Sequence, residues 1–335
     1  MLKKYKFQLS IIAIILVLTT ILIVYVLSGG FNNDTRHSDV PADTVILSSG
    51  DATMSFDEAF FLTKNTQAYY EAIYLSNDSK IDWNADTSNG TTNEAVVLEE
   101  SLNYIKQIFL FSEYAKSQGM TLTEKELDAV NEEVQLFLSD STKKVIDAAG
   151  ASEDVLTRVY TREAYYDKVC QQIYGTLNSN NTDDERRTCR VAAIEISPQY
   201  FDSPDRTAKK IMEKVNSGEI ITKVASIYGT EALEGSVSKG DMDGNSLEEL
   251  CLSLKDGECK MTQIDDTYFV VYCYMAYDAQ ATQQTAVQAF YDELSNKMPI
   301  TLNEDIWSTV NFDTAIFTDE DATTATTTAQ EILDK

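Results

Sequence analysis

The chain has 335 residues, of which 27 are basic and 54 acidic, and its formal charge is -27 at pH 7. A surface this acidic repels phosphate groups, which excludes nucleic acid as a partner. The chain has a single histidine, His37, and it lies in a polar stretch. A Ser-His-Asp triad, a Cys-His pair and a histidine-ligated zinc site are therefore excluded, and the length allows more than one domain.

The chain begins with a basic and then an apolar stretch. Lys3, Lys4 and Lys6 precede residues 9–27, which carry no charge. At about 1.5 Å per residue, a helix of this length spans a bilayer core of about 30 Å. The positive-inside rule places the N-terminus in the cytoplasm and the bulk of the chain outside. We therefore expect residues 1–28 to be a single-pass anchor in the cell membrane, in preference to a cleaved signal peptide.

Residues 29–54 are rich in Gly, Ser, Asn and Asp and are expected to be a linker. Residues 55–185 show a helical pattern. Ser55 with Glu58 and Thr123 with Glu126 match capping boxes, which start helices. Apolar residues then recur at helical spacing, and we favour a helix core over a peptide groove for them. They are Leu98, Leu102, Ile105 and Phe109, then Leu127, Val130 and Val134, then Val155, Val159, Tyr166, Val169 and Ile173.

A second domain is predicted over residues 186–278. It opens with a β-rich run at residues 189–197, and Ser203-Pro204 then marks a helix start. A second short helix, a Gly/Ser loop, an amphipathic stretch at residues 246–254 and a final strand follow. The order β-α-α-loop-α-β-β describes a small α+β domain. Residues 279–317 are expected to be a helical segment that returns to the first domain, and residues 318–335 a disordered tail.

The five cysteines contain no C-x-x-C pair, which argues against redox and zinc motifs. We expect them to be small buried side chains, with room for one or two disulfides and at least one unpaired thiol. They are Cys170, Cys189, Cys251, Cys259 and Cys273.

The second domain resembles the parvulin family of peptidyl-prolyl isomerases. The run DRTAKKIMEKVNSGEIITKVASIYG at residues 205–229 is similar to the first two helices of that family, and KGD at residues 239–241 to its Gly-Gly-Asp loop. SLEELCLSLKDGE, from residue 246, is similar to its Pro-Phe-Glu helix and the turn after it. YFVVYCYM, from residue 268, stands at the closing strand.

The first domain resembles the chaperone domain of PrsA- and SurA-type foldases, most clearly in FSEYAKSQGMTLTEKELDAVNEEV from residue 111. The likeness covers roughly residues 55–312, and the anchor is closer to the PpiD type. The resemblance implies a mostly α fold: a helical chaperone domain plus an α+β parvulin-like domain with a small antiparallel sheet. It also implies that the partners are unfolded or partly folded exported polypeptides.

The resemblance implies an active site that this chain does not reproduce. The two histidines of the family align with Ala193 and Phe269, and its Cys/Asp position falls near Glu231. Leu247, Leu252 and Phe269 are the residues expected to contact a substrate.

No metal ion and no cofactor is expected. The run from Asp241 to Asn245 resembles the start of a calcium loop, but Ser246 and Leu252 stand where that loop needs Gly and Glu.

Three functions remain open from the sequence. The first is a membrane-anchored extracytoplasmic foldase or chaperone whose parvulin-like domain has weak or no isomerase activity. The second is a divergent but active isomerase, because twisting and desolvating the prolyl bond can accelerate its rotation without histidine. The third is a membrane-tethered scaffold for one folded partner.

Overall fold

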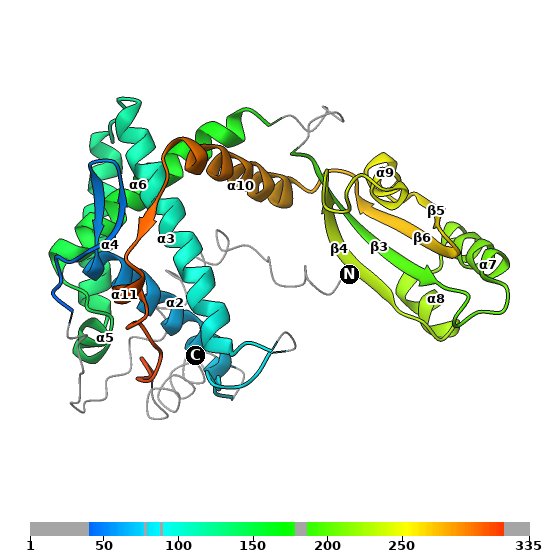
Figure 1. The fold of residues 1–335 in the computed structure, drawn as a ribbon, viewed down its shortest axis with the longest axis horizontal. Helices are drawn as coiled ribbons and strands as arrows, with labels where there is room; N and C mark the ends of the chain where they lie inside the picture. The colour runs from blue at the N-terminus through cyan, green and yellow to red at the C-terminus, as the bar shows by residue number, and fades with distance from the viewer. Residues whose placement is uncertain (1–39, 77–78, 88–89, 178–185, 318–335) are drawn as a thin grey trace, which may run out of the picture. The chain divides into compact units, whose positions relative to one another are not determined.

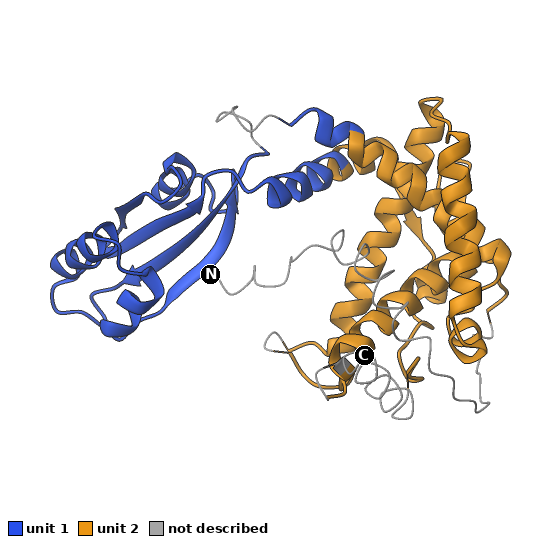
Figure 2. Cartoon of the chain, turned by 180° about the vertical axis from the view of Figure 1, so that it is seen from behind, with its two compact units in different colours: residues 1–10, 172–290 blue, residues 11–171, 291–335 orange. Residues whose placement is uncertain are grey.

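The computed structural model describes residues 40–76, 79–87, 90–177 and 186–317. The chain divides into two compact units (Figures 1 and 2). The sheet unit contains residues 172–290, and the helical unit contains the described residues up to 171 and from 291 onward. The predicted membrane anchor and the predicted tail lie outside the described residues. Within the described ranges, no helix is both long enough and apolar enough to cross a membrane.

The helical unit is built from long helices whose starts follow the predicted caps. The backbone N–H of Ser55 donates to Glu58 Oε2 at 3.0 Å, and Thr123 and Glu126 form a complete capping box. These caps satisfy backbone N–H groups that have no partner within the helix. The helices before the sheet unit are α2 (Phe56–Ser76), α3 (Asn93–Ser117), α4 (Glu124–Asp140), α5 (Lys143–Ala148) and α6 (Glu153–Gly175). Helix α10 (Ala279–Lys297) begins within the sheet unit and ends in the helical unit, which also contains α11 (Glu304–Trp307).

A three-stranded antiparallel sheet also belongs to the helical unit. Its strands are β1 (Val45–Ser49), β2 (Ala52–Ser55) and β7 (Thr301–Leu302), in the order β2-β1-β7. The prediction of a linker over residues 29–54 is therefore wrong from Val45 onward. Ile46 and Leu47 of β1 and Met54 of β2 are almost fully buried, and their burial stabilises these strands. The polar composition of the surrounding residues gave no sign of them.

The sheet unit is an antiparallel four-stranded sheet with helices on both faces. Its strands follow the order β4-β3-β6-β5. The predicted Gly/Ser loop contains a strand, β4, because Val237 and Ser238 are buried against the rest of the unit. In chain order the elements are β3 (Thr188–Ile196), α7 (Pro204–Asn216), α8 (Ile221–Ile227), β4 (Ala232–Ser238), α9 (Ser246–Ser253), β5 (Cys259–Ile264) and β6 (Thr267–Met275).

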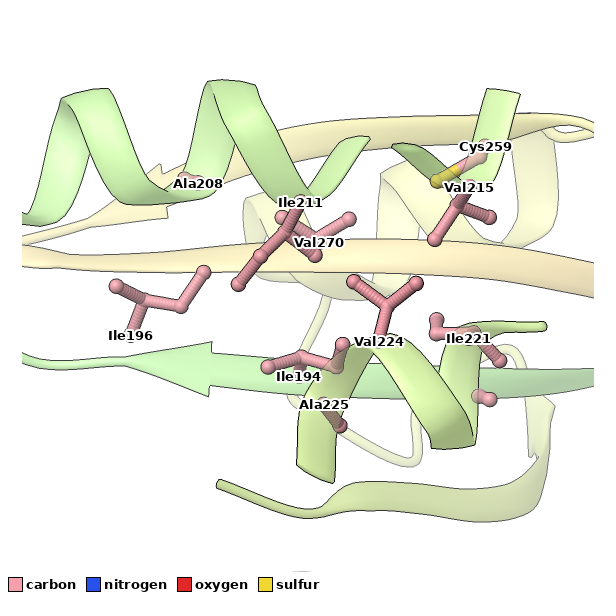
Figure 3. Close-up of a cluster of buried hydrophobic side chains, with 11 residues drawn as sticks. Ile194, Ile196, Ala208, Ile211, Val215, Ile221, Val224, Ala225, Cys259 and Val270 are labelled. Atoms are coloured by element: carbon pink, nitrogen blue, oxygen red, sulfur yellow. The ribbon is translucent and has the colours of Figure 1, made fainter. Parts of the chain in front are cut away.

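Helices α7 and α8 cover one face of this sheet, and the apolar core between them is shown in Figure 3. Ile194 and Ile196 of β3 meet Ile211 of α7 and Val224 of α8, all with less than 1% exposure. The alternation of side chains along β3 sends the intervening residues to the opposite face, under α9. The predicted fold class is confirmed: the chain is mostly helical, with a small α+β unit.

Candidate functional site

The candidate site is the face of the four-stranded sheet that α9 covers. Cys189, Val191 and Ala193 of β3 lie on this face, together with Val271 and Cys273 of β6. All are buried, and Val271 and Cys273 have no exposed surface. This face is therefore a packed apolar layer.

The two positions that the resemblance assigns to histidines lie close together on this layer. Ala193 is 7% exposed and lies opposite Val271 on β6 and Leu233 on β4. Phe269 is half-buried and lies opposite Glu195. Ala193 and Phe269 are thus diagonal neighbours on adjacent strands, as a pair of catalytic residues would be. A methyl group and a phenyl ring, however, can neither form strong hydrogen bonds nor exchange protons.

Helix α9 supplies the leucines predicted to contact a substrate. Asn245 caps the helix and accepts the backbone N–H groups of Leu247 and Glu248, both at 3.0 Å. Leu247 is buried in the same apolar cluster as Ala193, and Leu252 is half-buried against it. The structure therefore brings these leucines together with Ala193 and Phe269. The partly exposed apolar residues around the cluster are Met242, Leu250, Leu252, Ile264, Phe269 and Ala276.

Glu231 does not join this group. It is exposed and lies one residue before β4 begins, outside the apolar cluster.

Glu248 is the residue at this site that sequence reasoning missed. Its side chain is buried, and its carboxylate accepts the backbone N–H groups of Gly240 at 2.9 Å, Met242 at 2.8 Å and Gly244 at 3.3 Å. Burial alone would raise the pKa of Glu248, but the three backbone donors and Lys239 hold it below its usual value. Glu248 therefore shapes the loop before α9. A glutamate within an apolar stretch was the signal that could have identified it.

Asp241 has a related role in this loop. Its Oδ2 accepts the backbone N–H of Ser238 at 2.7 Å, which fastens the end of β4. Burial raises the pKa of Asp241, the Ser238 bond opposes that shift, and Glu248 adds to it. The carboxylates of Asp241 and Glu248 thus accept hydrogen bonds from backbone N–H groups and fix the conformation of the loop before α9.

The cysteines of the sheet unit are buried free thiols. Cys189 Sγ lies 3.4 Å from the carbonyl oxygen of Cys251, beneath α9. Burial, and then the nearby Cys273, raises the pKa of Cys189 to about 12, and burial likewise raises that of Cys251 to about 12. Thiols with such pKa values are poor nucleophiles. The predicted burial of the five cysteines is confirmed, and none of them forms a disulfide.

The site can therefore offer apolar contact and little else. Among the described residues, no group of three or more His, Cys, Asp or Glu side chains is arranged to hold a metal ion. The single histidine of the chain, His37, lies outside the described residues. General acid-base chemistry requires a titratable group near the reacting atoms, and the apolar layer beneath α9 has none with an accessible proton.

A second cluster with unusual chemistry lies in the helical unit, between α3, α4 and α6. Tyr104 donates its hydroxyl hydrogen to Glu163 Oε1 at 3.2 Å. Burial, together with repulsion from Asp167 and Glu133, raises the pKa of Glu163 to about 8, although the hydrogen bond from Tyr104 opposes the shift. Burial also raises the pKa of Asp167 to about 6. Glu163 is half-buried, whereas Glu133 and Asp167 are exposed, so carboxylates at the surface of the unit repel the charge of Glu163.

No model of a protein family matches the chain, and no curated protein matches it. Among solved structures, it is similar to the peptidylprolyl isomerase PrsA from Bacillus cereus, with 18% identity over 73% of this chain and 98% of that chain and a TM-score of 0.29. It is similar to PrsA from Bacillus subtilis, with 17% identity over 69% and 97% of the two chains and a TM-score of 0.25. A structure from work on two SurA-like chaperones of Campylobacter jejuni, PEB4 and Cj1289, shares 14% identity over 77% and 98%, with a TM-score of 0.22. These are likenesses of fold alone.

Proposed function

We propose that this chain is a membrane-anchored extracytoplasmic foldase or chaperone that holds unfolded exported polypeptides, and that its sheet unit has weak or no prolyl isomerase activity. The observation that carries the second part is the diagonal pair of Ala193 and Phe269, which puts apolar groups where the parvulin resemblance requires histidines. The anchor rests on the charge pattern of residues 1–28.

Exposed apolar side chains support the binding of unfolded chains. In the sheet unit, Tyr200 is 76% exposed, Ile220 55% and Ile227 67%. In the helical unit, Leu127 and Leu136 of α4 are 45% and 41% exposed. Such side chains contact apolar segments of a client without a fixed geometry. The net charge of -27 keeps a protein with exposed apolar groups soluble.

The holding function is tested by light scattering from several unrelated unfolded proteins diluted from denaturant, with residues 28–335 present or absent. We expect aggregation to fall in every case. The variant Ile220→Ser with Ile227→Ser should suppress less, and Lys223→Ser on the same helix should behave like the unchanged protein. Binding to one folded partner, with no effect on any unfolded chain, would contradict the proposal and point to a scaffold.

The isomerase part is tested by a protease-coupled proline isomerisation assay on the same protein. We expect a rate close to that of the uncatalysed reaction, whose barrier is about 18–20 kcal/mol. A rate comparable to that of a parvulin with both histidines would overturn this part.

One observation favours the second candidate, a divergent active isomerase. The half-buried Phe269 and Leu252 leave apolar surface beside α9 that a proline ring can contact. If this candidate is right, Leu252→Asp should reduce the isomerisation rate while the tryptophan fluorescence of the helical unit stays unchanged. Leu247→Asp should have the same effect, with added loss of sheet-unit stability because Leu247 is buried.

A further inference from the structure

A row of buried polar side chains runs along one face of α2. Lys64, Gln67 and Glu71 are 6%, 0% and 5% exposed, and their spacing places them on the same side of the helix. They are bonded in sequence: Lys64 Nζ donates to Gln67 Oε1, and Gln67 Nε2 donates to Glu71 Oε1, both at 2.8 Å. Buried polar groups of this kind require partners, because an unpaired one is costly.

The other bonds of this row go to the main chain of residues 311–317, apart from one between Glu71 and the side chain of Trp83. Lys64 Nζ donates to the carbonyl of Asn311 at 2.7 Å, and Gln67 Nε2 donates to the carbonyl of Thr314 at 2.9 Å. Glu71 Oε2 accepts the backbone N–H groups of Ile316 at 2.8 Å and Phe317 at 2.9 Å. None of these bonds involves a side chain of the segment.

The α3 helix adds one more contact of the same type. Glu94, in the first turn of α3, accepts the backbone N–H of Phe312 through Oε1. Glu94 and the polar row of α2 therefore bind backbone carbonyl and amide groups, which every polypeptide carries. Hydrogen bonds to the main chain bind a segment with little regard to its sequence.

Apolar side chains of the segment provide the other part of the contact. Phe312 is 3% exposed, its ring lies 4.6 Å from that of Trp83, and Lys64 Nζ lies 5.4 Å from its centre. Ile316 and Phe317 are 1% and 7% exposed. They pack in one cluster with Ala68 and Ala72 of α2 and Val145 of α5.

Residues 311–317 have neither helical nor strand structure, although they are held at both ends. The segment is held by main-chain hydrogen bonds and by apolar side chains at two points, as a peptide bound in a groove is held. We propose that the groove formed by α2, α3 and α5 is a general binding site for irregular, non-helical peptide segments, that residues 311–317 occupy it in cis, and that a segment of an unfolded client exchanges with them. This inference rests on the proposed holding function and identifies where a client segment binds.

The chemistry of the groove defines the ligand. It takes an irregular segment with a large apolar residue, three residues of any kind, and then two adjacent apolar residues. Proline is excluded at the positions of Phe312, Ile316 and Phe317, because each donates its backbone N–H to a glutamate. An acidic side chain directly after the first apolar residue is accepted, because Asp313 occupies that position and is attracted to the positive charge of Lys64.

The first test uses a fluorescein-labelled synthetic peptide with the sequence of residues 308–317, followed by anisotropy. In the full chain, Phe312→Ala with Ile316→Ala removes the anchors of the cis segment and leaves the groove intact. We expect this variant to bind the peptide at least tenfold more tightly than the unchanged chain. Adding Gln67→Ala to the variant should abolish the gain, and a peptide with alanine at the same two anchor positions should not bind.

Equal binding of the peptide by the variant and by the unchanged chain would overturn the proposal, provided that circular dichroism shows both to be folded. A variant that fails to fold is replaced by a measurement on the unchanged full chain. Amide hydrogen exchange of residues 312–317 is then followed with and without an excess of reduced, carboxymethylated α-lactalbumin. We expect the amides of Phe312, Ile316 and Phe317 to exchange at least tenfold faster with it, since displacement frees them from the two glutamates.

Different results would contradict the holding function and the α2 groove as its binding site. If the chain suppresses aggregation but exchange at residues 312–317 does not change, the proposed site is wrong and the holding function stands. If the chain suppresses no aggregation, the holding function is wrong, and peptide binding alone then decides whether the groove is a binding site.

Discussion

Arg162 on α6 donates from Nε to Glu58 Oε1 on α2 at 2.7 Å, and the two side chains are 12% and 4% exposed. The same guanidinium donates to Glu113 Oε1 on α3 at 2.7 Å and to the carbonyl of Thr53 on β2 at 2.8 Å. Burial alone would raise the pKa of Glu58, but Arg162 and Ser55 lower it overall. One arginine thus connects three helices and a strand of the helical unit.

Arg162→Leu should lower the free energy of unfolding of the helical unit by about 3 kcal/mol, because Glu58 stays buried and loses its main cation. The readout is urea unfolding followed by tryptophan fluorescence. Both tryptophans, Trp83 and Trp307, belong to the helical unit, so this signal reports on that unit alone.

The matched control for this change is Lys297→Leu. Lys297 pairs with Glu293 on α10, but their side chains are 65% and 64% exposed. This change should alter the free energy of unfolding by less than about 1 kcal/mol. Similar losses for the two variants would contradict the structural role assigned to Arg162.

Glu163 should make the helical unit less stable as the pH rises. Its pKa is about 8 in the folded chain against a usual value of 4.5, so the folded state binds the proton more tightly than the unfolded state. This contribution to stability is complete below about pH 4.5 and is lost as the pH rises through about 8. Urea unfolding at pH 5.5 and at pH 8.5 measures how much of the free energy of unfolding is lost between these two pH values. In Glu163→Gln this loss should be smaller than in the unchanged chain by at least about 1 kcal/mol.

The control for the pH dependence is Glu132→Gln, at an exposed position on α4. It should leave the difference between pH 5.5 and 8.5 as it is in the unchanged chain. The groups that face Glu163 are Glu133, Asp167, Tyr104 and Tyr160. A pH dependence that Glu163→Gln leaves unchanged would assign the effect to these neighbours instead.

Glu248→Gln should destabilise the sheet unit by about 2 kcal/mol, since an amide replaces a buried carboxylate that accepts three backbone N–H groups. The rate at which a thiol reagent labels the buried cysteines measures how often the unit opens, and it should rise more than tenfold. Glu249→Gln, at the next and exposed position, should leave the rate unchanged. The cysteines that report on this unit are Cys189, Cys251, Cys259 and Cys273.

Gly150→Ala should destabilise the helical unit more than Gly119→Ala does. Both glycines have positive φ angles, 65° and 71°, which cost an alanine about 1–2 kcal/mol. A Cβ at Gly150 would also lie 3.1 Å from Cδ1 of Phe60, whereas a Cβ at Gly119 meets no atom within 4 Å. Equal losses in urea unfolding would show that Phe60 moves aside freely.

The parts of the fold that the sequence predicted correctly are those that local chemistry decides. The helix starts at Ser55 and Thr123 need only residues three positions apart: Thr123 and Glu126 form a complete capping box, and Ser55 donates its backbone N–H to Glu58. β1 was missed although its partner β2 follows after a two-residue turn, because the polar composition of this stretch is typical of a linker, and its second partner, β7, lies about 250 residues further along the chain. β4 was missed because its glycine and serines are typical of loops.

The same distinction applies to the sites. The resemblance placed Ala193 in the opening strand and Phe269 in the closing strand of the second domain, and the register of β3 and β6 brings the two onto one apolar face. Glu248 was overlooked because a carboxylate in an acidic chain is usually solvated. The row from Lys64 to Glu71 was overlooked because its partners lie about 247 residues away.

The division of the chain has a consequence for how the protein is made. The sheet unit interrupts the helical unit, so α2 to α6 leave the ribosome before the sheet unit, and β7 and residues 311–317 come last. All strands of the sheet unit lie between residues 188 and 275, which lets that unit fold as soon as it emerges. Its folding also shortens the loop that must close before the last segment reaches α2. During its synthesis, this protein is therefore itself an incompletely folded chain. Its α2 groove stays unoccupied until residues 311–317 have left the ribosome.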